Sequence, residues 1–286
     1  TQRQAKTRAW VAERPRVPGH ALVFARLCVR DKSHGVHGFI VPIRDLDSHR
    51  LLPGVTAGDI GPKIGFNNMD NGWCRFERVR VPRAHMPMRF THVTQDGEVT
   101  RTGLDKAGYV TMMELRGLMV FDCRDCLAKA CTIAVRYSAV RRQGQVDKRT
   151  GLEPQVLSYA TQRHRLLGLV STAFALHFTG ERVLQMTREL RDKVQAGDAS
   201  SMQYVHGVLC GLKAICTRVC TDGIEECRKC CGGMGYLLAS GLPELLGHAL
   251  QYATAEGDNY VMAQQSSRFL LKVLQQTQGG DKSGAV

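Results

Sequence analysis

The sequence has little of what marks several protein classes. Aromatic residues make up 6% of its 286 residues, and only 2 of them are Trp. Few aromatic side chains leave few platforms on which single-stranded nucleic acid could stack. No run of about eighteen apolar residues is present that could span a bilayer as a helix. With 43% hydrophobic and 23% charged residues, the composition indicates a globular protein with a sizeable core.

Several catalytic signatures are also missing. The chain contains no Gly-x-Ser-x-Gly elbow, no Gly-x-Gly-x-x-Gly after a strand and no P-loop. The signatures of a serine hydrolase, a Rossmann dehydrogenase and a nucleotide triphosphatase are therefore all missing. None of the 10 His pairs with another at the helical spacing of a metal site.

Two cysteine pairs, Cys123/Cys126 and Cys227/Cys230, have the spacing of zinc thiolates. Both lie within long apolar-periodic stretches, where Cys more often packs as a small hydrophobe, so we predict no metal. The odd number of Cys, 11, favours reduced thiols in an intracellular protein over a disulfide scaffold.

Basic residues outnumber acidic ones. Lys plus Arg is 39 against 26 for Asp plus Glu, a formal net charge of +13. This balance suits an anionic partner, which could be nucleic acid, a membrane surface or a phosphorylated small molecule such as a nucleotide or coenzyme A. Charge alone does not choose among them.

Hydrophobic periodicity divides the chain near residue 100. The first part reads as β structure, with strands predicted at residues 21–29, 37–43 and 73–81 and a hairpin loop at 31–35. The second part has helical periodicity, with predicted helices at 109–141, from Pro154 at the first helical position to 194, and at 202–231, 242–250 and 259–275. The predicted fold is α+β: a β-rich domain at 1–100 and an antiparallel α-helical bundle at 101–286.

Two segments of the helical part could carry chemistry. Three glycines within Gly232–Tyr236 would let backbone amides approach a ligand, although a helix C-terminus also favours Gly. Glu256 lies in a small, apolar turn before the last helix, where a desolvated carboxylate could act as a general base. The alternative is that Glu256 and Asp258 only cap that helix.

Taken together, these segments resemble the acyl-CoA oxidases of peroxisomal fatty acid β-oxidation, relatives of the acyl-CoA dehydrogenases. In the β-rich part the similarity rests on His37 to Arg44, Gly54 to Lys63, Asp70 to Gly72, and Val81 to Arg83 with Met86. In the helical part it rests on Ala130 to Arg141, Glu153 to Gln155, Gly232 to Tyr236 and Thr254 to Asn259. The agreement is collinear from about residue 20 to residue 275 and covers most of the chain.

The resemblance implies an FAD-dependent enzyme that desaturates fatty acyl-CoA to trans-2-enoyl-CoA while O2 is reduced to hydrogen peroxide. It implies a middle domain that is a partial β-barrel or sandwich, incomplete at its start, and a helical domain of the dehydrogenase C-terminal type. Glu256 would be the catalytic base. Residues that would approach FAD, often across a homodimer interface, are Arg141, Gln143, Gly232, Gly233 and Gly235.

The resemblance also implies a chain shortened at both ends, with no recognisable N-terminal helical domain and an end at Ser283 to Val286 instead of Ser-Lys-Leu. A peroxisomal location is implied by the family alone. The rival hypothesis is a non-catalytic oxidase-like protein that keeps the bundle for dimerisation and has lost FAD binding. A nucleic acid binder attracted by the net charge is a third, weaker hypothesis, so we predict no nucleic acid partner.

Overall fold

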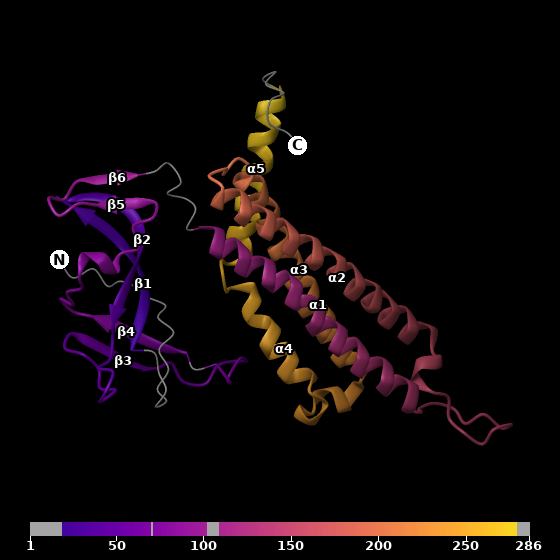
Figure 1. Cartoon of the computed structure of the whole chain (residues 1–286). Coiled ribbons are helices and arrows are strands. Elements are labelled where there is room, and N and C mark those ends of the chain that lie inside the picture. The colour runs from indigo at the N-terminus through magenta and orange to yellow at the C-terminus, as the bar shows by residue number, and fades with distance from the viewer. Residues whose placement is uncertain (1–18, 70, 102–108, 279–286) are drawn as a thin grey trace. The chain divides into compact units, whose positions relative to one another are not determined.

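The structure is a computed structural model that describes residues 19–69, 71–101 and 109–278 (Figure 1). Asp70, which contributes to the resemblance, lies outside these residues. The described chain forms two compact units. Residues 19–63, 67–69 and 71–101 make a β-rich unit, whereas residues 64–66 join 109–278 in a helical unit.

The β-rich unit begins with a long hairpin. Strand β1 (His20–Val29) pairs antiparallel with β2 (Lys32–Pro42). The turn consists of Arg30 and Asp31, whose φ angles of 49° and 60° fit a two-residue turn that matches the twist of the strands. Because this turn is so short, β2 already includes residues 33–35, and the predicted five-residue loop was wrong.

The remaining strands form two further pairs. Strand β3 (Val55–Asp59) pairs with β4 (Gly72–Phe76), and β5 (Thr91–Val93) pairs with β6 (Val99–Arg101), both antiparallel. The described strands thus make three two-stranded sheets and no closed barrel, so a partial barrel or sandwich is not supported. β4 ends at Phe76, which corrects the strand predicted to run to residue 81.

Two small apolar clusters pack these strand pairs against one another. One gathers around Ile43, Val55 and Cys74, and the other around Leu27, Met86 and Val93. The β1–β2 hairpin contributes side chains to both clusters, so it links the other two pairs.

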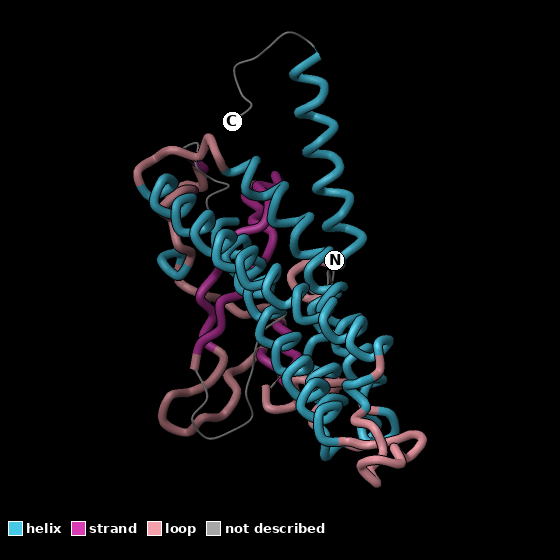
Figure 2. Tube along the Cα trace, turned by 90° about the vertical axis from the view of Figure 1, so that its right-hand side faces the viewer, coloured by secondary structure: helices cyan, strands magenta, loops and turns pink. Residues whose placement is uncertain are grey.

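The helical unit contains three long helices and two shorter ones. They are α1 (Tyr109–Val140), α2 (Ala160–Gln195), α3 (Met202–Cys230), α4 (Leu242–Leu250) and α5 (Asn259–Gln278). α1, α2 and α3 lie side by side along most of their length (Figure 2). α1 and α2 approach so closely that a Cβ added at Gly180 would lie 2.9 Å from the Cα of Phe121.

Helix α2 begins six residues later than its proline suggests. Pro154 stays outside the helix because its carbonyl accepts a hydrogen bond from the backbone N–H of Gln143 at 3.1 Å, and the N–H of Val156 donates to the carbonyl of Arg141 at 2.8 Å. Residues 141–156 thus fold back on the end of α1. A proline is as compatible with this extended return as with the first turn of a helix, and tertiary pairing decides between them.

Cysteines form much of the core between α1 and α3. All described cysteines except Cys28 are buried, and every one is a free thiol. The Sγ atoms of Cys131 and Cys227 are 3.9 Å apart. Among the described residues, no three or more His, Cys, Asp or Glu side chains are arranged to hold a metal ion. Nor does any described helix have the length and apolar character needed to cross a bilayer.

Candidate functional site

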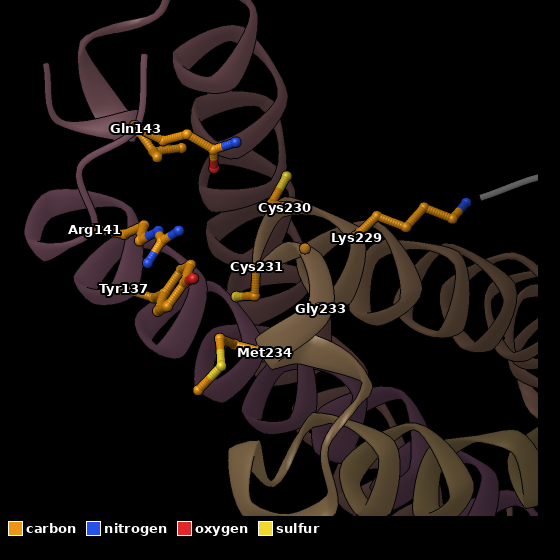
Figure 3. Close-up of a pocket in the computed structure, with 10 residues that line it drawn as sticks. Tyr137, Arg141, Gln143, Lys229, Cys230, Cys231, Gly233 and Met234 are labelled. Carbon is orange, nitrogen blue, oxygen red and sulfur yellow. The ribbon is translucent and has the colours of Figure 1, made fainter. Parts of the chain in front are cut away.

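A pocket of about 410 Å³ lies where the C-terminal ends of α1 and α3 meet (Figure 3). Four of the six residues singled out from the sequence line it: Arg141, Gln143, Gly232 and Gly233. Tyr137 approaches from α1 and Arg141 from the position just after its last residue, while the end of α3 and the loop after it contribute the opposite wall. Gly235 and Glu256 are absent from the lining.

The glycine-rich wall is a short 3₁₀ helix, η4 (Gly232–Tyr236), rather than a simple helix stop. Gly232 has a φ of +58°, a left-handed conformation that glycine adopts at little cost. A Cβ added at Gly232 or Gly233 would meet no atom within 4 Å, so both present bare backbone to open space. Gly235 is buried instead, and its added Cβ would lie 2.1 Å from the carbonyl oxygen of Arg228.

Arg141 supplies an uncommitted positive charge to this pocket. Its backbone is fixed on both sides, since its N–H donates to Tyr137 at 2.8 Å and its carbonyl accepts from Val156. The exposed guanidinium, however, makes no hydrogen bond or ion pair within the described chain. An unpaired guanidinium suits a phosphate or pyrophosphate, which it can bind through two parallel hydrogen bonds.

The helix ends that carry the pocket are tied together by Gln162, a buried residue of α2. Its Nε2 donates to the Oγ of Ser138 at 3.0 Å and to the carbonyl of Cys230 at 2.8 Å, which joins the ends of α1 and α3. Beside it, burial raises the pKa of the Cys231 thiol to about 11. This thiol is therefore neutral near pH 7 and adds no charge to the lining.

Glu256 lies in a separate turn between η6 (Gln251–Ala253) and α5. It adopts a left-handed backbone with a φ of +53°, and Gly257 follows at +110°. Capping of α5 falls to Asp258, whose Oδ1 accepts a hydrogen bond from the N–H of Tyr260 at 2.9 Å. The half-buried Glu256 carboxylate has no hydrogen-bond or ion-pair partner within the described part of the chain. It remains free to accept a proton.

The sequence analysis missed two buried cations beside this turn. Arg116 of α1 is 6% exposed and Lys213 of α3 is fully buried. Both face the carbonyl groups of the Glu256 turn. A signal was present in the sequence, because both residues fall in apolar stripes of predicted helices. Lys and Arg are almost never fully buried without partners, so a basic residue in such a stripe indicates a buried contact.

Comparison with known proteins decides the family. The model described as "Acyl-CoA oxidase, C-alpha1 domain" matches residues 109–271. The chain belongs to the acyl-CoA oxidase family. The family resemblance stated from the sequence is thereby confirmed.

Among the relatives, the peroxisomal acyl-coenzyme A oxidase 1 of Mus musculus is 41% identical over 277 residues, which cover 97% of this chain. That of Arabidopsis thaliana is 42% identical over 284 residues. The chain spans 42% of the length of the mouse protein and 43% of the Arabidopsis one.

Solved oxidase structures share the fold. Arabidopsis thaliana acyl-CoA oxidase 1 has a TM-score of 0.89 at 42% identity, covering 97% of this chain and 42% of its own. Acyl-CoA oxidase-2 of Caenorhabditis elegans, a structure bound with FAD, ascaroside-CoA and ATP, has a TM-score of 0.92 at 37% identity, with 97% and 41% covered.

Proposed function

We propose that this chain forms part of an FAD-dependent acyl-CoA oxidase of peroxisomal fatty acid β-oxidation, acting as a homodimer. The observation that carries the proposal is the meeting of Arg141, Gln143, Gly232 and Gly233 around one pocket at the ends of α1 and α3. These residues come from segments about ninety positions apart in the sequence. The proposal draws further support from the relative whose structure is bound with FAD.

The pocket residues fit FAD in two respects. The cofactor carries an anionic pyrophosphate, and Arg141 has no carboxylate partner within the described chain to compete for it. Open space beyond Gly232 and Gly233 leaves their backbone accessible to a planar or phosphorylated group. We therefore assign Arg141, Gln143, Gly232 and Gly233 to cofactor binding. Gly235 is assigned to packing, because its Cβ position is filled by the Arg228 carbonyl.

Glu256 is the residue we assign to proton transfer. Its free carboxylate takes the α-proton of the acyl-CoA thioester, and the electron pair of that C–H bond becomes part of the new Cα=Cβ double bond. FAD, held by Arg141, Gln143, Gly232 and Gly233, would supply the acceptor for the β-hydride and the redox chemistry by which O2, two electrons and two protons give hydrogen peroxide. The turn must hold the Glu256 carboxylate within hydrogen-bond distance of the α-carbon, because proton transfer requires that geometry.

The test begins with cofactor retention. Purified chain is incubated with FAD and desalted, and the visible flavin absorbance that remains is compared with that of Arg141→Gln. The matched control is Arg136→Gln, which changes an exposed arginine in the last turns of α1 that does not line the pocket. We expect wild type and the control to stay yellow and Arg141→Gln to lose most of its flavin.

A colourless wild-type chain would contradict the proposal for this chain. Equal retention by wild type and Arg141→Gln would contradict the assignment of the pocket. A colourless wild-type chain would favour an oxidase-like protein that dimerises without the cofactor. A molar-mass measurement in solution would then test whether the chain is a dimer.

A further inference from the structure

We propose that Lys213 and Arg116 are positioning residues that hold the turn carrying Glu256 in its working conformation. The inference rests on the proposed function, because it gives Glu256 the role of base. The structural claim, that two buried cations fix this turn, stands on contacts that can be tested without any cofactor.

Lys213 holds the turn from α3. Its Nζ donates to the carbonyl of Gly257 at 2.6 Å, to the Oδ1 of Asn259 at 2.9 Å and, more weakly, to the carbonyl of Ala253 at 3.4 Å. These three acceptors match the three donors of an ammonium group. They lie on both sides of Glu256 in the sequence, so one side chain fixes both ends of the turn.

Arg116 holds the same turn from α1. Its Nε donates to the carbonyl of Glu256 itself at 3.0 Å. The same guanidinium also contacts α3, because its Nη1 lies 3.4 Å from the Nδ1 of His206 and 3.8 Å from the Sγ of Cys210. The residue that carries the proposed base is thus attached through its backbone, which leaves its carboxylate free.

A third attachment joins α3 to the start of α5. The Nδ2 of Asn259 donates to the Oγ1 of Thr217 at 2.9 Å. Asn259 therefore receives a hydrogen bond from Lys213 and gives one to a residue one helical turn further along α3. This arrangement fixes the entry into α5 as well as the turn.

The two cations are costly to bury, which argues against a role in packing alone. Neither forms an ion pair with a carboxylate among the described residues. Desolvation, followed by the charge of Arg116, lowers the pKa of Lys213. Apolar side chains of similar size would fill the space at a smaller cost. What apolar side chains cannot do is satisfy the inward-facing carbonyls of this turn.

The conformation of the turn also calls for such support. Glu256 is a non-glycine residue with a φ of +53°, and such residues persist in the left-handed region only where their surroundings impose it. At Gly257, with a φ of +110°, an added Cβ would lie 2.6 Å from the Met262 side chain. Without the cationic contacts, we expect the segment to relax toward commoner backbone angles and to move the carboxylate.

The first test measures amide hydrogen exchange, by mass spectrometry, in peptides that span residues 253–260. It compares the wild-type chain with Lys213→Met, which keeps the length of the side chain and removes its donors. We expect exchange in this turn to become about tenfold faster or more, while peptides from α1 and α2 keep their wild-type rates. The control is Lys272→Met, which changes an exposed lysine of α5 and should leave the turn as it is.

A second variant covers the case in which Lys213→Met does not fold. Arg116→Lys keeps the positive charge but loses the Nε donor that reaches Glu256. It should also speed exchange in residues 253–260. Unchanged exchange of the turn in whichever variants fold would overturn the inference.

The functional readout separates positioning from general damage. In FAD-loaded chain mixed anaerobically with a fatty acyl-CoA, we expect Arg116→Lys to retain its flavin, to keep its Kd for the acyl-CoA and to bleach at least about tenfold more slowly. A fall in rate that only tracks lost flavin would contradict positioning. If wild type fails to bleach, the proposed function fails, and the exchange result still decides whether the cations hold the turn.

Discussion

Replacing Gly235 with alanine separates packing from ligand contact in the glycine-rich loop. A Cβ at this position would lie 2.1 Å from the carbonyl oxygen of Arg228 and 3.1 Å from the Cβ of Cys231. The nearer obstacle is backbone at the end of α3, which cannot swing away as a side chain would. Overpacking of this kind costs about 1–3 kcal/mol, so we expect Gly235→Ala to lower the free energy of unfolding by about that amount.

The assay is urea denaturation followed by far-UV circular dichroism, which reports on the helical unit. Thermal melting offers a second measure, because about 1 kcal/mol corresponds to roughly 2–4 °C in a domain of 150–250 residues. The matched control is Gly233→Ala, two positions away, where an added Cβ meets no atom within 4 Å. Its free energy of unfolding should stay within about 0.5 kcal/mol of wild type.

Flavin retention should not follow stability in the control variant. Gly233→Ala adds a methyl group to the pocket lining and should retain less flavin than wild type, despite its normal stability. A Gly235→Ala chain as stable as wild type would refute the reasoning, because it would mean that η4 can move off the Arg228 carbonyl at no cost.

Two further predictions concern the surroundings of the pocket. Arg228 donates two hydrogen bonds to Glu225, at 2.6 and 2.7 Å, and holds the pKa of that carboxyl below its ordinary 4.5. The pair therefore stabilises the fold above about pH 4.5 and loses its effect as pH falls through the lowered pKa. We expect Glu225→Gln to flatten the acid side of a plot of urea midpoint against pH. An unchanged slope would exclude the pair as a cause of acid destabilisation. Gln162→Leu leaves the buried Cys230 carbonyl without its donor and should cost about 1–3 kcal/mol by urea denaturation, whereas a neutral effect would show that another donor replaces it.

The helices were largely predictable from the sequence. A period of three to four residues persists over many turns, and the short helix predicted at residues 242–250 has the observed bounds of α4. The start of α2 was missed because it depends on two hydrogen bonds, from Gln143 to Pro154 and from Val156 to Arg141, that join residues more than ten positions apart. Local chemistry at a proline does not reveal whether the chain will pair across a loop.

The β-rich part was less predictable for a related reason. Alternation of apolar residues indicates strands and their faces, but it does not state which strands pair or how many cores they share. The hairpin turn at Arg30 and Asp31 also lacks glycine, the usual sign of a left-handed turn. The structure therefore contains a shorter turn and more separate sheets than the sequence suggested.

Part of the candidate site could be read from the chain and part could not. The family resemblance pointed to Arg141, Gln143, Gly232 and Gly233, which the fold gathers in one pocket. The role of Lys213 could not be recognised, because a lysine in an apolar stripe signals a buried charge but gives no indication of its acceptors. Those acceptors are mostly backbone carbonyls 40 and 44 residues away, and only the tertiary fold brings them together.

The central claim, that Glu256 is the base of an acyl-CoA oxidase, is tested most directly by flavin bleaching. FAD-loaded wild type, Glu256→Gln and Asp258→Asn are each mixed anaerobically with a fatty acyl-CoA, and the loss of visible flavin absorbance is followed. We predict that wild type bleaches, that Asp258→Asn bleaches at a similar rate, and that Glu256→Gln keeps its flavin but bleaches at least about 100-fold more slowly. Bleaching of Glu256→Gln at the wild-type rate would contradict the account.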